Sequence, residues 1–559
     1  MNEYKLQPLV NIASICAKKQ VKHAVLSPGS RCAPLCMAMV RHPEIITKTI
    51  SDERSAAFIA MGMAQQDKSP VVIVCTSGTA ALNYGPAIAE AFYQNVPLIV
   101  LTADRPDEWV DQQDGQTIRQ RNIFENHVKA SYHLPASFEH PDAQWQYDRT
   151  ISEAINTANA FPKGPVHINI PIREPFYPAV DETLNFDYPV KVIESFEATL
   201  DFTESQWNLL SDELVGYEKI LIVAGQDSKN EELAASLAQL PFPVCADVIS
   251  NYSFLPNAIR HQDVFLNKVD GELTPDLLIT FGNSVISKNL KLYLRKHKPK
   301  AHWQIQPAGN AADTYQALSR IIRITPEVFF SKLAAMPSND LRETSYLNKW
   351  KREDSNYDLG KAEFFTSQPF SELEAVSTLI DQLPESTNLH LANSMSVRYA
   401  NFINIKDRPD VEVMANRGSS GIDGCTSSMI GHSLINDKPN ILITGDLAFF
   451  YDRNAFWNNY VNKGNQKVLL LNNHGGVIFR MIDGPARQPE LEEYFETFQH
   501  SNAEQLCKEF GIHYISAKTR EEYEVAIKEF TSISDKPCIL EVETEKQLNK
   551  EVFQAFKKI

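Results

Sequence analysis

An acidic side chain and an amide side chain each follow a short apolar stretch in the last quarter of the chain. Asp446 comes after residues 441–443, and Asn473 comes after residues 468–471. Each apolar stretch gives way to small or polar residues, as a buried parallel strand does where it ends. The two residues are 27 positions apart, about the length of one strand-helix-strand crossover. We therefore expect Asp446 and Asn473 to lie side by side at the edge where open α/β sheets bind ligands.

The oxygen atoms at this edge suit a hard divalent cation. Mg²⁺ takes an octahedron of oxygen ligands and usually completes it with phosphate oxygens and water. The Asp446 carboxylate, the Asn473 amide oxygen and the backbone carbonyl of Gly475 would supply protein ligands. A turn that leads into a helix also offers free N–H groups to a diphosphate. The alternative is a tight turn at Asp446 and an ordinary strand-end cap at Asn473, but the paired spacing favours the metal site.

Two further groups of residues stand where strands are predicted to end. Glu53 opens a predicted helix of small residues over 55–66, where the alternative role is that of a helix cap or dipole partner. The candidate cations are Arg31, Arg105, Lys288, Arg398 and Arg417. Surface arginine is the alternative for any one of them, yet a cluster in a chain of net charge −16 indicates substrates with several carboxylates. Ser30, Gln116 and Ser394 would add neutral donors.

The pairing of Gly-Asp446 with Asn473 resembles the cofactor signature of thiamine-diphosphate enzymes. The resemblance implies thiamine diphosphate as cofactor, with Asp446, Asn473 and the Gly475 carbonyl as ligands of Mg²⁺, for which Mn²⁺ can substitute. It also implies that Glu53 hydrogen-bonds the aminopyrimidine ring and so drives proton removal from the thiazolium carbon. In the family a glycine or small residue usually follows the aspartate, whereas here Leu447 does.

A wider set of motifs resembles the branch of this family that works in menaquinone biosynthesis. The motifs are Ser-Pro-Gly-Ser-Arg31, Ser-Asp-Glu53-Arg, Thr-Ser-Gly-Thr79-Ala, Thr-Ala-Asp-Arg105-Pro, Asn-Arg417-Gly-Ser-Ser-Gly-Ile422-Asp-Gly and Asn-Asn473-His-Gly-Gly. The resemblance implies a transferase that decarboxylates 2-oxoglutarate and adds the resulting succinyl carbanion to isochorismate. It also implies a site shared between two chains of a homodimer or homotetramer, because Glu53 and Asp446 lie in different domains.

The resemblance assigns roles residue by residue. It implies Glu53, Gln116, Ser394, Arg398 and Arg417 as catalytic residues. Substrate contacts fall to Ser30, Arg31, Arg105, Gln116, Lys288, Ser394, Arg398, Ile478 and Phe479. Cofactor contacts fall to Glu53, Ser394, Arg417, Ile422, Asp446, Asn473 and Gly475. Ile422 matches the apolar residue that supports such cofactors, with an ordinary core isoleucine as the alternative. Around Lys288 the residues also fit an exposed helix.

The elements that must position these residues alternate between strand and helix. Predicted strands in the first third cover 23–26, 71–75, 98–102 and 166–170, with helices over 6–19, 33–40, 55–66, 80–93 and about 151–160. The last third repeats this scheme with strands over 388–392, 412–415, 441–443 and 468–471. Alternation of this kind predicts an α/β fold of three doubly wound domains with mainly parallel sheets. The similarity between the two ends is architectural, because little sequence is shared.

We place the amino-terminal pyrimidine-binding domain at 1–185, a central α/β domain at 190–345 and the diphosphate- and Mg-binding domain at 358–559. The linkers are residues 176–189, which are rich in proline, and the polar residues 337–358. The central domain has predicted strands at 220–224 and 277–280. Gly225 does not continue into a G-x-G-x-x-G motif, so dinucleotide binding by this domain is unsupported.

The length and composition of the chain restrict the classes of protein to which it can belong. With 559 residues and 43% hydrophobic residues the chain is long enough for several cores. The net charge of −16 argues against nucleic acid and anionic membranes as partners. Membrane insertion is not expected, because no apolar run approaches the roughly 20 residues of a membrane helix and the amino terminus lacks a signal peptide's apolar core. Eight cysteines without a C-x-x-C motif fit a cytoplasmic protein with reduced thiols.

Two other functions compete with the carboligase. One keeps the cofactor but acts as a simple 2-oxoacid decarboxylase or an enzyme similar to acetolactate synthase, which needs a smaller and less cationic pocket. The other is a non-catalytic α/β scaffold. A scaffold has no need for Glu53 or for the pairing of Asp446 with Asn473, so the presence of both favours an enzyme.

Overall fold

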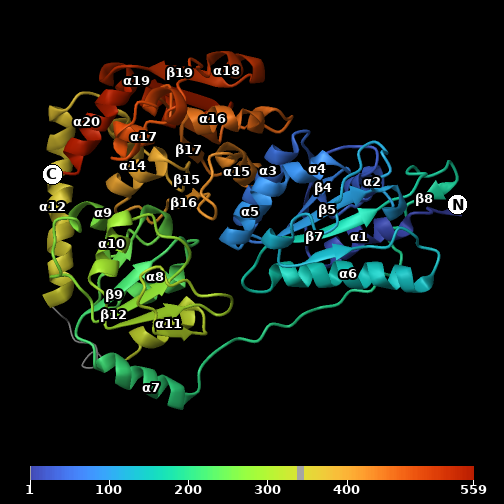
Figure 1. Cartoon of the computed structure of the whole chain (residues 1–559), viewed down its shortest axis with the longest axis horizontal. Coiled ribbons are helices and arrows are strands. Elements are labelled where there is room, and N and C mark those ends of the chain that lie inside the picture. Colours follow the sequence, from blue (N-terminus) through green and yellow to red (C-terminus); the bar gives the residue numbers. More distant parts are fainter. Residues whose placement is uncertain (1, 337–344, 462, 559) are drawn as a thin grey trace.

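The computed structural model describes residues 2–336, 345–461 and 463–558, and it is built around three six-stranded sheets (Figure 1). Every strand pairing in these sheets is parallel. The strands are rich in Val, Ile and Leu and are mostly buried along their whole length, as parallel strands covered by helices on both faces must be. The fold class predicted from the sequence is therefore confirmed.

The amino-terminal sheet has the strand order β3-β2-β4-β5-β7-β6. Its strands are β2 (His23–Leu26), β3 (Ile46–Thr49), β4 (Val71–Cys75), β5 (Leu98–Asp104), β6 (Ser131–His133) and β7 (Val166–Pro171). Its helices are α1 (Gln7–Lys18), α2 (Ala33–Arg41), α3 (Glu53–Asp67), α4 (Thr79–Asn83), α5 (Gly85–Gln94) and α6 (Pro141–Asn159). A separate two-stranded ribbon pairs β1 (Asn2–Glu3) with β8 (Glu182–Thr183).

The central sheet has the order β11-β10-β9-β12-β13-β14, the doubly wound arrangement in which strand order reverses beside the first strand. Its strands are β9 (Ile220–Ala224), β10 (Val244–Ala246), β11 (Ala258–Ile259), β12 (Leu277–Phe281), β13 (Ala301–Ile305) and β14 (Arg320–Ile322). Its helices are α7 (Glu204–Val215), α8 (Glu231–Ala238), α9 (Gln262–Phe265), α10 (Lys288–Lys296) and α11 (Pro326–Ala334). Gly225 serves packing here, because a Cβ atom would come within 2.2 Å of the Asn283 carbonyl oxygen.

The carboxy-terminal sheet has the order β16-β15-β17-β18-β20-β19. Its strands are β15 (Asn388–Leu391), β16 (Glu412–Ala415), β17 (Asn440–Gly445), β18 (Gln466–Asn472), β19 (His513–Ala517) and β20 (Cys538–Glu543). Its helices are α13 (Glu372–Asp381), α14 (Met395–Ile403), α15 (Cys425–Leu434), α16 (Asp446–Tyr451), α17 (Ile478–Met481), α18 (Glu504–Phe510), α19 (Arg520–Thr531) and α20 (Lys546–Phe556). Helix α12 (Ser345–Ser367) runs along the outer side of the central and carboxy-terminal domains (Figure 1).

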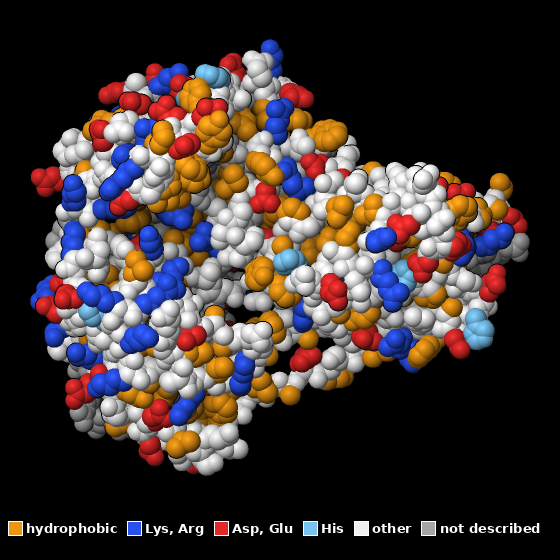
Figure 2. All heavy atoms as spheres, viewed as in Figure 1, with side chains coloured by type: hydrophobic (Ala, Val, Ile, Leu, Met, Phe, Trp, Pro, Cys, Tyr) orange, Lys and Arg blue, Asp and Glu red, His pale blue; other side chains and the backbone are white. Residues whose placement is uncertain are grey.

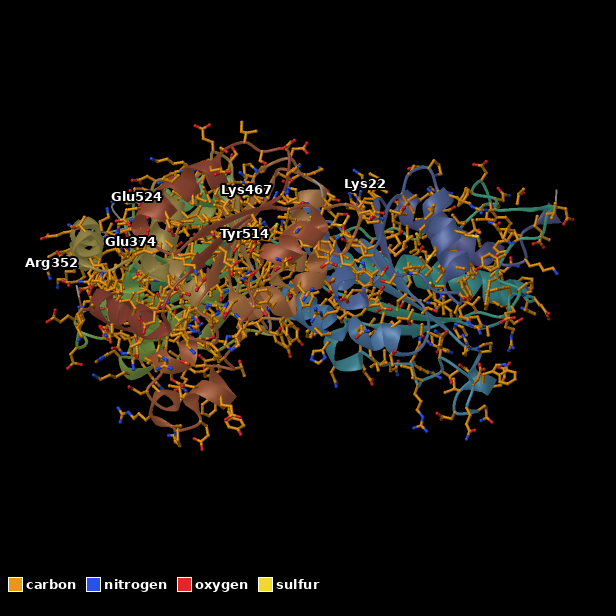
Figure 3. All side chains as sticks on the ribbon, turned by 90° about the horizontal axis from the view of Figure 1, so that it is seen from above. Lys22, Arg352, Glu374, Lys467, Tyr514 and Glu524 are labelled. Carbon is orange, nitrogen blue, oxygen red and sulfur yellow. The ribbon has the colours of Figure 1, made fainter. Side chains whose placement is uncertain are left out.

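The amino-terminal domain extends away from the other two and meets the carboxy-terminal domain through α3 and α15 (Figures 1 and 3). Both helices are buried along most of their length and are rich in small residues, which allows close contact between them. A Cβ atom on Gly62 would lie 2.1 Å from the Ser428 carbonyl oxygen, and one on Gly431 would lie 2.1 Å from that of Ile59. The backbones of the two helices therefore meet directly.

Three local predictions differ from the structure. The helix expected over 80–93 is divided into α4 and α5, because Gly85-Pro86 starts a new helix. The helix expected near 151–160 is only the second half of α6. Part of the linker expected at 337–358 is helical, since α12 begins at Ser345, whereas residues 337–344 lie outside the described residues. Among the helices described, none has both the length and the apolar character to cross a membrane.

Candidate active site

Strands β17 and β18 bring Asp446 and Asn473 to one edge of the carboxy-terminal sheet. The pairing of Gly445 with Leu471 places the two side chains just past the ends of adjacent strands. Asp446 is buried, and its Oδ1 accepts a hydrogen bond of 2.8 Å from the backbone N–H of Leu447. Its Oδ2 accepts another of 2.8 Å from the Gln499 amide. Burial raises the pKa of Asp446, and the hydrogen bonds oppose that rise.

Asn473 presents an oxygen atom that has no hydrogen-bond partner in the described part of the chain. Its Nδ2 donates a hydrogen bond of 2.7 Å to Oε1 of Glu372, which is itself buried. Its Oδ1 is buried and has no hydrogen-bond partner among the described residues. Burial, together with the charge of Asp446, raises the pKa of Glu372 to about 7. A buried amide oxygen without a hydrogen bond has free lone pairs, and a metal ligand needs such lone pairs.

The backbone at Gly475 completes the oxygen-rich edge. A Cβ atom there would approach the Glu496 carbonyl oxygen to 2.7 Å, so only glycine fits without a shift of the chain. In the described part of the chain, no group of three or more His, Cys, Asp and Glu side chains could hold a metal ion. A cation at this edge would therefore depend on one carboxylate, one amide oxygen and a backbone carbonyl, with phosphate oxygens and water for the remainder. These donors fit Mg²⁺.

Glu53 is not used as a helix cap. Helix α3 is capped by Asp52, whose carboxylate accepts hydrogen bonds from the backbone N–H groups of Arg54 and Ser55 at 3.0 and 3.3 Å. The Glu53 carboxylate is half-buried and accepts one long hydrogen bond of 3.4 Å from Asn83. The capping alternative is thus excluded, and the carboxylate is left available at the end of the second strand of its sheet.

The loop of residues 416–424 is fixed from both sides. The buried carboxylate of Glu90 on α5 accepts hydrogen bonds from the backbone N–H groups of Gly418 and Ser419, both 2.7 Å. Asn393 donates to the carbonyl oxygens of Asn416 and Gly421 at 2.7 and 2.6 Å. The loop holds Ile422, whose side chain is 37% exposed although it is large and apolar. These contacts keep the loop in one conformation while Ile422 faces outward.

Three guanidinium groups lie buried or half-buried at the sheet edges without an ion pair. They belong to Arg31, Arg398 and Arg417, and none takes part in the ion pairs found among the described residues. Arg31 donates to the Ile172 carbonyl oxygen at 2.7 Å, and Arg417 donates to Oδ1 of Asn393 at 2.8 Å. Burial lowers the pKa of all three. Burying an unpaired cation costs free energy, so such groups point to anionic ligands.

Comparison with known proteins identifies the family. Models described as "Thiamine pyrophosphate enzyme, N-terminal TPP binding domain", "Middle domain of thiamine pyrophosphate" and "Thiamine pyrophosphate enzyme, C-terminal TPP binding domain" match residues 11–129, 204–391 and 397–542. A relative from Cytophaga hutchinsonii is 45% identical over 99% of both chains. One from Flavobacterium johnsoniae is 38% identical over 96% of this chain and 95% of its own. Both are named 2-succinyl-5-enolpyruvyl-6-hydroxy-3-cyclohexene-1-carboxylate synthase.

The chain belongs to this synthase family. A relative from Bacteroides fragilis, 36% identical over 98% of both chains, carries the same name. The chain is therefore a thiamine-diphosphate-dependent synthase of menaquinone biosynthesis, as the sequence predicted. The alternative of a non-catalytic scaffold is wrong.

The synthase chain holds its predicted site residues in two groups. In the amino-terminal domain, Arg105 pairs with Asp114 at 3.0 Å and donates to the Gly115 carbonyl oxygen at 2.7 Å. Gln116 therefore lies next to the arginine in the same loop, and it faces the turn at Gly78. Exposed Ser30 precedes Arg31 in the first turn of this edge. Strand ends of one sheet thus bring these residues together.

The second group lies in the carboxy-terminal domain and at its boundary with the central one. The Ser394 carbonyl oxygen accepts a hydrogen bond from Arg398. Ile478 and Phe479 begin α17, directly after the turn that holds Asn473. The last two predicted residues are Lys288 and Arg417. Each lies near a lysine that the sequence did not single out.

Those lysines are Lys557 and Lys291. Burial lowers the pKa of Lys557. The charge of Asp263 opposes this, and the charges of Lys288 and Arg398 add to it. Burial also lowers the pKa of Lys291, opposed by the charge of Asp247 and assisted by that of Arg417. Basic side chains gather on the visible face where the carboxy-terminal and central domains meet (Figure 2). The boundary between these two domains therefore holds lysines in addition to the predicted cations Lys288, Arg398 and Arg417, with the carboxylates of Asp247 and Asp263 beside them.

Among the described residues, no hydrogen bond or ion pair joins Glu53 to the edge that carries Asp446. The start of α3 instead contacts the far end of α16, where Arg54 donates to the Tyr451 carbonyl oxygen at 2.8 Å. Asn454 also donates to the Asp52 carboxylate at 2.7 Å.

Sequence reasoning missed the residues that support the site, namely Glu90, Glu372, Asn393 and Gln499. Glu372 follows Ser371, whose hydroxyl caps α13, so its position resembles that of an ordinary acid in a first helical turn. The partner of Glu372 lies 101 residues away. No local sequence pattern predicts a contact over this distance along the chain.

Proposed function

We propose that this synthase decarboxylates 2-oxoglutarate and adds the succinyl unit to isochorismate, releasing CO₂ and forming the compound in its relatives' name. The observation that carries the proposal is the set of buried or half-buried guanidinium groups of Arg31, Arg398 and Arg417, which have no carboxylate partners among the described residues. Both substrates are dicarboxylates, and arginine binds carboxylates through two parallel hydrogen bonds. Lys288, Arg105 and the neutral donors Ser30, Gln116 and Ser394 complete the set assigned to substrate.

Asp446, Asn473 and Gly475 would hold Mg²⁺ or Mn²⁺, and through it the diphosphate of the cofactor. Bound thiamine diphosphate supplies the carbon-centred chemistry for which the protein has no group of its own. In this proposal Ser394 and Arg417 contact the cofactor, and Ile422 supports it from the rigid loop held by Glu90. Ile478 and Phe479 line the substrate side and limit the access of water.

Glu53 holds a proton-transfer position on the pyrimidine side of the cofactor. Because no hydrogen bond or ion pair joins Glu53 to the Asp446 edge among the described residues of one chain, we propose that Glu53 of one copy faces Asp446 of a second copy, in a homodimer or homotetramer. The domain limits 1–185, 190–345 and 358–559 and the cytoplasmic location remain predictions of the sequence. The eight cysteines are all free thiols, which agrees with a reducing environment.

The deciding experiment is an assay of the purified chain with thiamine diphosphate, Mg²⁺, 2-oxoglutarate and isochorismate. We expect CO₂ release and a new adduct in mass spectrometry. Pyruvate in place of 2-oxoglutarate tests the competing function of an acetolactate-synthase-like enzyme or simple decarboxylase. A product from pyruvate alone, with none from 2-oxoglutarate, would overturn the proposed substrates. Circular dichroism titration with the cofactor, with and without Mg²⁺, tests the metal requirement separately.

A further inference from the structure

A buried carboxylate stands behind the predicted metal ligands without a role in the site described above. Glu372 is the first residue of α13 and is 1% exposed. Its Oε1 accepts the hydrogen bond of 2.7 Å from Nδ2 of Asn473. Its own backbone N–H donates to Oδ1 of Asn549 at 3.0 Å. The position of the carboxylate is therefore fixed by the start of the helix and by a contact with α20.

The chemistry of an amide side chain explains what this contact does. The two ends of the Asn473 carboxamide are nearly equal in size, but only the oxygen can bind a cation. Oε1 of Glu372 acts as the acceptor in this contact, so it takes the NH₂ end of the amide. The oxygen is then left at the sheet edge, where Oδ1 has no partner among the described residues. Without the carboxylate, either end of the amide could turn toward the metal.

Asp446 has a supporting contact of the opposite polarity. Nε2 of Gln499 donates to its Oδ2 at 2.8 Å. An amide therefore orients the carboxylate ligand, while a carboxylate orients the amide ligand. Such outer contacts fix the orientation and basicity of metal ligands in proteins.

We propose that Glu372 is a positioning residue for the metal centre, which holds the Asn473 carboxamide with its oxygen toward the cation. The inference rests on the proposed function, since that function makes Asn473 a ligand of Mg²⁺. It adds a residue from outside the sheet edge to the machinery of cofactor binding.

Mg²⁺ affinity in the presence of thiamine diphosphate is the quantity to measure. Circular dichroism of the bound cofactor reports on it, and the electron paramagnetic resonance spectrum of Mn²⁺ gives an independent signal that needs no turnover. Glu372→Gln can either accept from or donate to the Asn473 amide, so it no longer selects one end, and we expect an affinity between those of the wild type and Glu372→Leu. Glu372→Leu removes the acceptor, and we expect affinity to fall about 10–100-fold.

Glu374→Leu is the matched control. Glu374 lies two residues further along α13, is also buried and pairs with Arg520 at 2.6 Å (Figure 3). Its loss should lower the melting temperature but leave Mg²⁺ affinity unchanged. Wild-type affinity in Glu372→Leu, or an equal loss in Glu374→Leu, would overturn the inference.

A second test exchanges the donor and acceptor roles of Glu372 and Asn473. It examines the positioning role even if Glu372→Leu does not fold. Asn473→Asp alone places two carboxylates in contact, and their repulsion should weaken Mg²⁺ binding. Adding Glu372→Gln restores a donor and an acceptor, so the double variant should regain much of the affinity. A double variant no better than Asn473→Asp contradicts the positioning role. If the wild type itself binds no Mg²⁺, the proposed metal site fails before this inference is reached.

Discussion

The amino-terminal and carboxy-terminal domains share one scaffold but present different chemistry on it. Numbered within each domain, the two sheets have the same order, 2-1-3-4-6-5. The helix after the second strand is α3 in one domain and α15 in the other, and these two helices pack together. Gly62 meets the carbonyl of Ser428, three residues before Gly431, which in turn meets that of Ile59, three residues before Gly62. The contact therefore has approximate two-fold symmetry.

The equivalent sheet edges carry different groups. After the third and fourth strands, the carboxy-terminal domain has Asp446 and Asn473, which offer oxygen atoms to a cation. At the same positions the amino-terminal domain has the turn at Gly78 and the buried Asp104, which precedes the Arg105 loop. The Asp104 carboxylate already accepts hydrogen bonds from Asn169 and from the backbone N–H of Arg105. The available acidic group of this domain, Glu53, follows the second strand instead. The shared scaffold fixes where ligands bind, and a few residues at the strand ends decide which part of a ligand each edge can hold.

The largest effect should come from Asp446→Ala. Loss of the Asp446 carboxylate, the one acidic ligand assigned to the metal, should abolish Mg²⁺-dependent binding of thiamine diphosphate, which circular dichroism titration measures. Asp437→Ala is the control, because Asp437 is exposed and pairs only with Lys463 at the surface. Undiminished cofactor affinity in Asp446→Ala would refute the metal assignment and remove the contrast between the two edges.

Glu53→Gln should lower turnover by about 10² or more, since a positioned acid-base group contributes that much. Because Asp52 caps α3, the variant should fold normally and keep its Mg²⁺ affinity. The measurements are the steady-state kcat and the cofactor titration of the same preparation. Near-normal turnover would remove Glu53 from its role.

Mixing the two inactive variants tests the shared site directly. If each site combines Glu53 of one copy with Asp446 of another, mixed oligomers of Glu53→Gln and Asp446→Ala chains contain one intact site. Activity should then appear when the two are unfolded and refolded together. Failure of this complementation, in preparations where mass spectrometry shows mixed oligomers, contradicts the two-chain site.

Gly62→Ala tests the contact between the equivalent helices. The new methyl group would meet a backbone oxygen at 2.1 Å, and neither helix can yield at its centre. We expect the free energy of unfolding to fall by about 3 kcal/mol, the upper end for overpacking a core. A lower melting temperature would show this loss. Gly85→Ala is the matched control, because no atom lies within 4 Å of the Cβ position there. Equal melting temperatures for the two variants would show that the helices separate at little cost.

Arg398→Ala should weaken binding of the dicarboxylate substrates by about 2 kcal/mol, roughly thirtyfold. Its guanidinium is half-buried and makes no ion pair among the described residues, so its charge remains available to a ligand. KM for each substrate is the measurement, with Arg352→Ala as control, since Arg352 is exposed on α12 (Figure 3). Wild-type KM values for both substrates would contradict a role of the Arg398 guanidinium in binding substrate carboxylates.

Sequence reasoning succeeded where a feature is local. The strands at 23–26, 71–75, 220–224 and 412–415 have the predicted bounds, because apolar runs end at turn residues on both sides. The association of Asp446 with Asn473 followed from spacing alone. Helix α12 was missed because its polar residues resemble those of a linker. Glu90 and Glu372 were missed because each acts on residues far along the chain, and only the folded contact distinguishes them from helix-start acids or surface acids.

The smallest predicted effect concerns Asp452, which lies where the start of α3 meets the carboxy-terminal domain. Its buried carboxylate accepts hydrogen bonds from the backbone N–H and the hydroxyl of Ser427 at 2.6 and 2.7 Å, and Arg54 lies 4.0 Å away. Burial nevertheless raises its pKa to about 7. The folded chain therefore holds this proton at pH values where the unfolded chain has already released it. Between about pH 4 and pH 7, the contribution of Asp452 to stability must fall as the pH rises.

Asp452→Asn removes this dependence but keeps the contacts, since the amide can accept from the Ser427 N–H and donate to its hydroxyl. The melting temperature of the variant should therefore decline less than that of the wild type between pH 5 and pH 7. The corresponding difference in the free energy of unfolding is on the order of 1 kcal/mol. Parallel profiles would mean that Asp452 is ionised in the folded protein and that Arg54 of the amino-terminal domain offsets its burial. The start of α3 would then bind the carboxy-terminal domain through a charge pair as well as through the helix contact at Gly62.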